Sequence, residues 1–145
     1  MRTLYAESSA VLRWLLGTPQ ASSIQATLGA AAEVVTSALT AAEVRRTLRR
    51  LAAAGSLTPE ARDRAIARFT HASARWIVHR VTDEVLTRTG ESFPIEPLRT
   101  LDAVHIATAE FHSREIRSTT VLSFDVRVRE NAEAMGLAVQ PPKLR

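Results

Sequence analysis

Short apolar runs alternate with longer amphipathic stretches along the chain. The short runs are rich in β-branched residues and predict buried strands, at 3–6, 34–37, 76–81 and 119–123, with an edge strand at 137–139. The stretches with apolar residues three and four apart predict helices, at about 8–17, 20–31, 40–54, 58–73, from 82, from about 101, and at 125–135. This alternation favours an α/β layer fold with a mainly parallel central sheet flanked by helices.

Several predicted helices begin at recognisable capping signals. Ser8 stands where a serine N-cap precedes an apolar helical face, and Gly17 follows that face. Thr40 and Glu43 match the S/T-x-x-E capping box and predict the start of a long helix. Thr58 is followed by proline, which is favoured at the first helical position. These signals place helix N-termini shortly after the predicted strands.

Four acidic residues lie where the predicted strands end or the following helices begin. Glu7 follows the first strand, and Asp125 follows the strand at 119–123. Glu43 and Asp102 fall in the first turns of their predicted helices. In an open parallel sheet these positions share one edge, which carries the ligand crevice at the topological switch point. The four carboxylates are therefore predicted to converge on one pocket.

Each acid also has a local explanation. Glu43 completes the capping box, Asp125 is placed to cap a helix, and Asp102 is favoured in a first turn by the helix dipole. Glu7 is expected to have no capping role, because the serines that follow it are available for that purpose.

Convergent carboxylates repel one another, and a divalent cation removes that conflict. The chain has 0 cysteines, which excludes a disulfide framework, a thiol nucleophile and a thiolate zinc site. Ligands that are all oxygen favour Mg²⁺ or Mn²⁺. Such an ion typically activates water and neutralises phosphate oxygens, so the predicted chemistry is hydrolysis of a phosphodiester.

Composition adjusts this picture in three ways. A chain of 145 residues is expected to form a single domain over 1–145. The excess of 19 Lys+Arg over 15 Asp+Glu gives a net charge of +4, which permits a phosphate-bearing partner. No apolar run reaches the roughly 20 residues of a membrane span, and the early Glu7 argues against a signal peptide. We expect a cytoplasmic protein with no membrane association.

Four segments resemble the PIN-domain family, and specifically VapC-type ribonuclease toxins. They are Leu4–Ala10 with Glu7, Thr36–Glu43, Leu98–Ala109 with Asp102, and Leu122–Asp125 with the Asn131-Ala132 and Gly136-Leu137 pairs. Their order and spacing fit that family over nearly the whole chain. The resemblance implies a PIN-like three-layer α/β fold.

The resemblance also implies the identity of the site. It assigns an acidic metal site to Glu7, Glu43, Asp102 and Asp125, with Ser9 and Ser37 as supporting polar neighbours. It implies a Mg²⁺-dependent endoribonuclease, with Mn²⁺ as an alternative ion, that acts on structured RNA such as tRNA or rRNA. It further implies a cognate antitoxin protein as partner and a homodimer.

Arginines cluster on the helix that begins near Glu43. Arg45, Arg46, Arg49 and Arg50 form i, i+4 pairs on that helix. They are explained either as a solvated face or as contacts to RNA or to an acidic segment of the antitoxin. His105 is expected to be a hydrogen-bonded packing residue, and Trp14 and Trp76 are expected in the core.

One residue departs from the family pattern. Aspartate is usual where this chain has Glu7, and the extra methylene moves the carboxylate by about 1.5 Å. An alternative function is therefore a nuclease-dead PIN fold that binds RNA or protein. A third is a helical interaction protein that uses its arginine face, in which case the four acids would not cluster.

Overall fold

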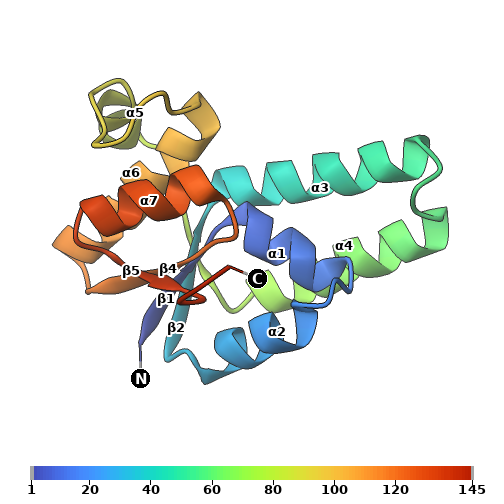
Figure 1. The fold of residues 1–145 in the computed structure, drawn as a ribbon. Coiled ribbons are helices and arrows are strands. Elements are labelled where there is room, and N and C mark those ends of the chain that lie inside the picture. The colour runs from blue at the N-terminus through green and yellow to red at the C-terminus, as the bar shows by residue number, and fades with distance from the viewer. Residues whose placement is uncertain (1, 145) are drawn as a thin grey trace.

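The computed structural model describes residues 2–144 and contains, within them, a central sheet flanked by helices (Figure 1). The strands are β1 (Thr3–Ala6), β2 (Glu33–Ser37), β3 (Ile77–His79), β4 (Thr119–Leu122) and β5 (Ala138–Gln140). The helices are α1 (Ser8–Leu15), α2 (Ala21–Ala30), α3 (Ala38–Ala53), α4 (Pro59–Ser73), α5 (Asp83–Thr89), α6 (Thr100–Glu115) and α7 (Val126–Ala134). The predicted α/β fold with a parallel sheet is confirmed.

The five strands form one sheet in the order β3-β2-β1-β4-β5, and every neighbouring pair is parallel. The first strand is central: Thr3 pairs with Glu33 of β2 on one side and with Thr119 of β4 on the other. The chain therefore leaves β1 toward one edge and later returns to its other side. That reversal is the topological switch point, and all strands end at the same edge there.

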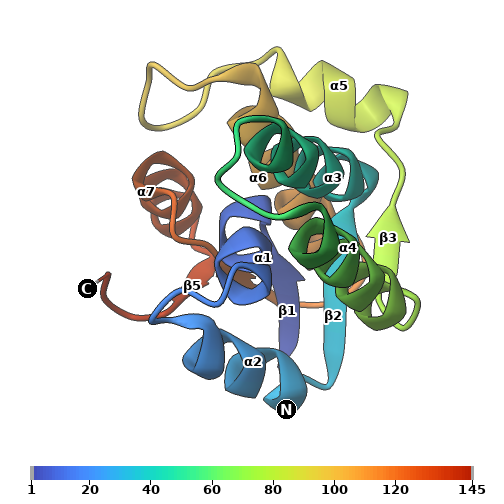
Figure 2. The same ribbon diagram turned by 90° about the vertical axis from the view of Figure 1, so that its right-hand side faces the viewer.

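Successive strand residues point to opposite faces of the sheet, and both faces are covered. Leu4 and Leu122 belong to a core that also contains residues of α1–α4, whereas Tyr5 and Val121 pack with residues of α5–α7. Two views at right angles show helices on either side of the sheet (Figures 1 and 2). Strands buried on both faces are what parallel sheets require, which explains their nearly continuous apolar sequence.

The start of α3 differs from the prediction. Ser37, not Thr40, is the N-cap: its backbone is extended and its Oγ accepts from the Leu39 N–H at 3.1 Å. Thr40 lies inside the helix, where its Oγ1 accepts from Thr36 Oγ1 at 2.8 Å. The capping-box interpretation is therefore wrong, and Glu43 lies in the second turn rather than the first. The serine that ends β2 is nearer to the free N–H groups and displaces the threonine from that role.

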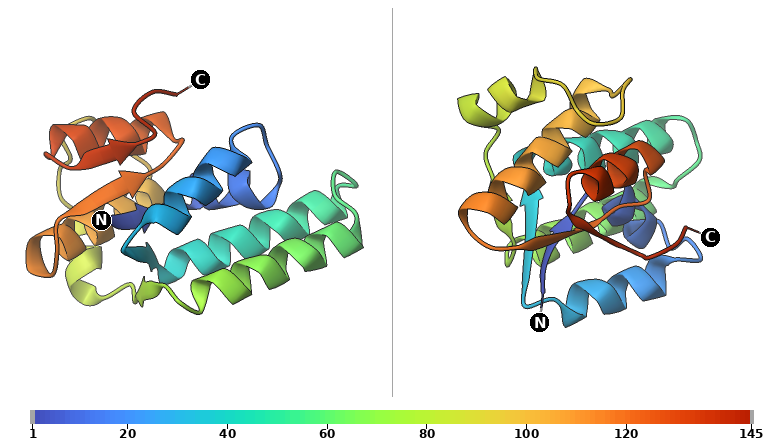
Figure 3. Two further views of the ribbon diagram at one scale, coloured as in Figure 1. Left: turned by 90° about the horizontal axis from the view of Figure 1, so that it is seen from below. Right: turned by 60° about the vertical axis from the view of Figure 1, so that its left-hand side comes forward.

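Helices α3 and α4 run together away from the sheet (Figure 3). The Arg45 guanidinium lies 5.5 Å from the Phe69 ring centroid, and that of Arg68 lies 4.7 Å from the Trp14 ring. Both arginines thus pack their planar groups on aromatic rings of the core. Trp14 is buried as predicted. Within residues 2–144, no helix has the length and apolar character needed to cross a membrane.

A pair of histidines links the β3 edge of the sheet to α6. His79 Nε2 lies 2.7 Å from His112 Nδ1, and His112 Nε2 lies 3.6 Å from the Glu33 carboxylate. His112 is fully buried. Burial lowers the pKa of both imidazoles below 6.5, and the neighbouring imidazole contributes at His79; the Glu33 charge opposes this at both. Folding therefore favours the neutral pair.

This pair predicts a loss of stability in acid. Between the lowered pKa values and about 6.5, the unfolded chain binds more protons than the folded one, so the free energy of unfolding falls as pH decreases through that range. We expect the Tm difference between wild type and the double variant His79→Gln/His112→Gln to shrink from pH 7.5 to pH 5.5. Differential scanning calorimetry at the two pH values measures it.

The matched control is His71→Gln, because His71 is exposed on α4. Its Tm is expected to follow the wild type at both pH values. The comparison with a variant is needed because His105 also titrates. Its raised pKa makes the free energy of unfolding fall as pH rises, which is opposite to the effect of the histidine pair. A Tm difference that does not change with pH would show that the pair is not protonated on unfolding.

Candidate active site

Glu7 begins α1 and is its N-cap residue. Its backbone is extended, with φ −82° and ψ 150°, and its Oε1 accepts from the Ser9 N–H at 3.2 Å and from Ser8 Oγ at 2.8 Å. The prediction that Glu7 has no capping role is therefore wrong. The helix already includes Ser8, and the glutamate side chain is long enough to fold back onto the first turn. This contact also holds the carboxylate at the end of β1.

Serine hydroxyls from two strand ends surround the Glu7 carboxylate, which is only 3% exposed. Ser9 Oγ and Ser123 Oγ both donate to its Oε2, the latter at 2.7 Å. Ser9 Oγ in turn accepts from the Phe124 N–H at 2.9 Å, and Ser123 Oγ accepts from the Asp125 N–H at 3.1 Å. These bonds join the end of β1 to the end of β4. A buried carboxylate needs such donors, since water cannot reach it.

Glu43 approaches the same edge from the second turn of α3. Its Oε1 lies 2.5 Å from His105 Nε2, and His105 Nδ1 lies 2.8 Å from the Tyr5 hydroxyl. His105 is 1% exposed, so it is the hydrogen-bonded packing residue that the sequence predicts. Burial opposes protonation, but the hydrogen bond that His105 donates to Glu43 and the charge of Glu7 raise the pKa of His105. Ser8 Oγ lies 3.5 Å from His105 Nε2 and so connects the histidine with Glu7.

Asp102 lies in the first turn of α6, as predicted. Burial and the negative charges of Asp125 and Glu7 raise its pKa, while Arg99, at 3.6 Å, lowers it. Asp125 and Glu7 therefore lie close enough to Asp102 for their charges to affect it. The predicted capping role of Asp125 is also confirmed, because its Oδ1 accepts from the Val128 N–H at 3.0 Å.

The four acids thus arrive at one edge from the ends of β1 and β4 and from the first two turns of α3 and α6. The supporting residues differ from the prediction in part. Ser9 contacts the Glu7 carboxylate, whereas the Ser37 hydroxyl caps α3, and among the described residues no carboxylate bonds to it. Ser123 was missed as a supporting residue, although its place two residues before Asp125 was a usable signal.

The donor set fits a hard cation, but the side chains are engaged elsewhere. Across residues 2–144, no three acidic or histidine side chains are already positioned to bind one metal ion. Glu7 is turned toward serine hydroxyls, Glu43 toward His105, and Asp125 toward the α7 amides. All four acids supply carboxylate oxygens, the ligands that Mg²⁺ and Mn²⁺ prefer. Binding such an ion requires some of these side chains to rotate.

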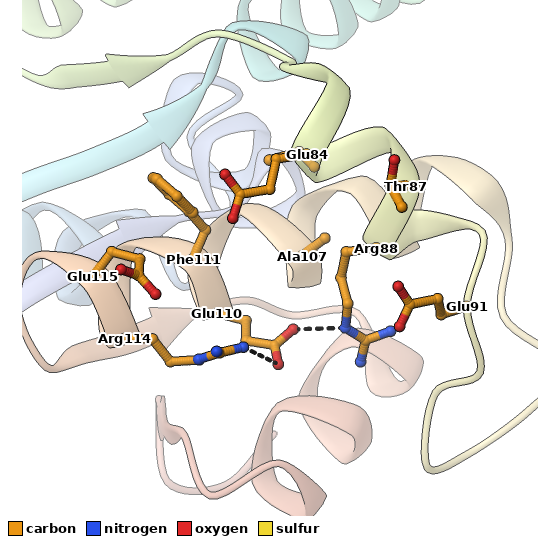
Figure 4. Close-up of a pocket in the computed structure, with 10 residues that line it drawn as sticks. Glu84, Thr87, Arg88, Glu91, Ala107, Glu110, Phe111, Arg114 and Glu115 are labelled. Carbon is orange, nitrogen blue, oxygen red and sulfur yellow. Dashed lines mark hydrogen bonds and ion pairs between the residues drawn. The ribbon is translucent and has the colours of Figure 1, made fainter.

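A cavity of about 470 Å³ lies elsewhere, between α5 and α6 (Figure 4). Its residues include Phe111 and an ion-paired group in which Glu110 bridges Arg88, at 2.9 Å, and Arg114, at 3.7 Å. None of the predicted site residues lines it. Because none of the four strand-end acids faces it, we place the candidate active site at the strand ends and not in this cavity.

Comparison with known proteins identifies the family of the chain. The PIN domain family model matches residues 4–134. Ribonuclease VapC46 of Mycobacterium tuberculosis is 32% identical over 142 residues, which cover 98% of this chain and 99% of that protein. Ribonuclease VapC35 of the same species is 40% identical over 60 residues, which cover 41% of this chain and 44% of that protein.

Solved structures share the fold at low sequence identity. Mycobacterium tuberculosis VapC20, described as a toxin that cleaves the sarcin–ricin loop, superposes with a TM-score of 0.66 at 16% identity, covering 93% of this chain and 96% of that one. FitAB bound to a DNA fragment gives 0.68 at 20% identity, covering 98% and 97%. The family match and the near full-length relative together show that the chain belongs to the PIN-domain family and, within it, to the VapC type.

Proposed function

We propose that this protein is a divalent-metal-dependent endoribonuclease, the toxin component of a type II toxin–antitoxin pair. The observation that carries the proposal is the position of four carboxylates at one edge of the sheet: two follow β1 and β4, and two lie in the first two turns of α3 and α6. The relationship to VapC46, a ribonuclease by name, supports the choice of RNA as substrate. VapC20 and its sarcin–ricin loop make a structured RNA such as rRNA or tRNA the expected class.

Four carboxylate side chains would bind the ion. Glu7, Glu43, Asp102 and Asp125 would hold Mg²⁺ or Mn²⁺, which when bound would activate water and neutralise charge on a phosphodiester. The chain's own groups set the geometry. Ser9 holds the Glu7 carboxylate at the end of β1. His105 contacts the Tyr5 hydroxyl through Nδ1 and holds the Glu43 carboxylate through Nε2, at the same edge of the sheet.

Exposed arginines on α3 supply contacts for the polyanionic substrate or for an acidic segment of an antitoxin. Arg46, Arg49 and Arg50 are exposed, whereas Arg45 is half-buried and hydrogen-bonded to Thr70 at 3.2 Å. The first three are therefore the stronger candidates. Two structural neighbours, VapBC2 of Rickettsia felis and FitAB, were solved as complexes bound to DNA, which supports a cognate antitoxin partner here. We also propose a homodimer.

A nuclease-dead PIN fold that binds RNA or protein is the second candidate function. One observation favours it: Glu7 replaces the usual aspartate, and its carboxylate is held by hydroxyls of Ser8, Ser9 and Ser123. Those bonds oppose rotation of the side chain toward an ion. The two functions make opposite predictions for metal binding.

We expect the purified chain to cleave cellular RNA in Mg²⁺ or Mn²⁺ and to lose that activity in EDTA. The physical reason is that the repelling carboxylates can approach a phosphate only when a cation neutralises them. Gel analysis of RNA after incubation measures cleavage, and isothermal titration calorimetry measures binding of each ion. A chain that binds neither ion and cleaves no RNA would establish the nuclease-dead alternative.

A further inference from the structure

A cavity of about 410 Å³ lies beside the candidate active site, where the chain after β5 comes close to the start of α2 (Figure 1). Its lining residues are Gln20, Ser23, Phe124, Pro141, Pro142 and Lys143. The volume falls within the range of about 300–1,000 Å³ that is typical of small-ligand sites. An aromatic ring, two prolines, a carboxamide and a cation therefore meet in one hollow.

Phe124 connects this cavity to the acidic edge. It stands between Ser123, which donates to the Glu7 carboxylate, and Asp125, and its N–H donates to Ser9 Oγ at 2.9 Å. The ring is half-buried, and the Arg13 guanidinium lies 4.9 Å from its centroid. Phe124 lines the cavity and Arg13 does not. The ring therefore borders the cavity and also packs against a guanidinium.

The polar groups of the cavity suit an uncharged ring attached to a phosphate. Gln20 Oε1 is buried and has no hydrogen-bond partner within residues 2–144, so it would gain one if the side chain turned to meet a ligand N–H. Lys143 supplies a positive charge at the rim, and none of the six described lining residues is acidic. The α5–α6 cavity, in contrast, is lined by four glutamates and only two arginines, both of them paired with Glu110, so its net charge is unfavourable for a phosphate.

We propose that this cavity binds the base of the RNA nucleotide next to the one whose phosphodiester lies at the acidic edge. The proposal rests on the proposed function and adds a residue that contacts the substrate. Phe124 stacks on the base, the Gln20 carboxamide bonds to the base edge, and Lys143 contacts a backbone phosphate. Single-stranded RNA is commonly bound in this way, by aromatic stacking together with hydrogen bonds to base edges.

A nucleobase fits these observations better than a peptide segment of a partner protein. Phe124 directly precedes Asp125, and their Cα atoms are about 3.8 Å apart, so the cavity adjoins the proposed phosphate position along the chain. The polar end of the cavity offers one buried acceptor and one cation, which match one base and one phosphate. A peptide would need several backbone partners along an extended groove.

The test compares nucleotides with the same molecule lacking its base. The metal-free full chain, labelled with ¹⁵N, is titrated with AMP, GMP, CMP and UMP and with ribose 5-phosphate. We expect at least one nucleotide to shift the amide signals of Phe124 and Gln20 and to bind about 5- to 150-fold more tightly than ribose 5-phosphate. Gln20→Leu should weaken that binding about 2- to 12-fold.

Phe124→Leu keeps apolar packing and removes the aromatic face, so it should abolish the preference for nucleotide over ribose 5-phosphate. Phe111→Leu is the matched control, because Phe111 is another half-buried phenylalanine that lines the α5–α6 cavity. It should retain the preference. No preference in the wild type, or one that survives Phe124→Leu, would overturn the proposal and leave the cavity to a protein partner. Failure of the metal-dependent cleavage assay would instead contradict the proposed function, since the titration needs no turnover.

Discussion

Asp102→Asn is expected to abolish RNA cleavage and, at the same time, to raise the Tm of the protein at neutral pH. Loss of a proposed metal ligand should lower the cleavage rate at least about 100-fold, since even outer neighbours of metal sites cost about 10- to 100-fold. Stability should rise because burial and the charge of Asp125 raise the pKa of Asp102 in the fold. An ionised side chain at this position therefore destabilises the folded protein, and a neutral amide does not.

The sign of this effect depends on pH in a defined way. Between 3.8, the ordinary pKa, and the raised pKa of Asp102, the folded protein binds more protons than the unfolded chain. The stability contribution of the group falls as pH rises through that interval. The advantage of Asp102→Asn should therefore be full at neutral pH and absent below about pH 4. Calorimetric Tm values across this range measure it.

Asp83→Asn is the matched control, because Asp83 is an exposed first-turn acid of α5. It should lower stability by about 0.3–1 kcal/mol through the helix dipole and leave cleavage unchanged. Added Mg²⁺ or Mn²⁺ should raise the Tm of the wild type and not that of Asp102→Asn, because only a protein that binds the ion is stabilised by it. Unchanged cleavage in Asp102→Asn would remove this residue from the proposed site.

The fold was predictable because local signals and the global arrangement agree. The apolar runs that became β1, β2 and β4 are buried on both faces, and such strands belong to parallel sheets. The strand predicted at 76–81 is shorter, since β3 covers only Ile77–His79 at the sheet edge. An edge strand pairs on one side only, so residue preference alone does not fix its ends.

The positions of the four acids in the fold were predictable, and their hydrogen-bond partners were less so. Glu43 and Asp102 come from distant segments, and the rule that parallel strands end together was sufficient to bring them to one edge. Side-chain partners across the sheet carry no such signal. The bond between Ser123 and Glu7 joins residues that are 116 positions apart. The capping role of Glu7 was missed for a related reason, because it depends on those hydroxyls as well as on the adjacent helix.

Glu7→Gln is expected to lower both stability and cleavage, in contrast to Asp102→Asn. The Glu7 carboxylate accepts four hydrogen bonds, from the Ser9 N–H and from the hydroxyls of Ser8, Ser9 and Ser123. An amide would direct an NH₂ group at donors that need an acceptor. Hydrogen bonds to charged groups contribute about 1.5–3 kcal/mol each, so losing one or two should cost about 1.5–6 kcal/mol. Urea unfolding at neutral pH measures the change.

Two further variants separate charge from reach. Glu7→Asp keeps the charge and the capping bond to Ser9 but shortens the side chain by about 1.5 Å, so it should give up the bond to Ser123. We expect a smaller loss of stability than in Glu7→Gln, with cleavage retained. Glu130→Gln, on the exposed side of α7, should change neither property. If Glu7→Gln were as stable as the wild type, the serine hydroxyls would not be holding a charged carboxylate. The different hydrogen bonding of Glu7 and Asp102 would then make no difference of this kind to stability.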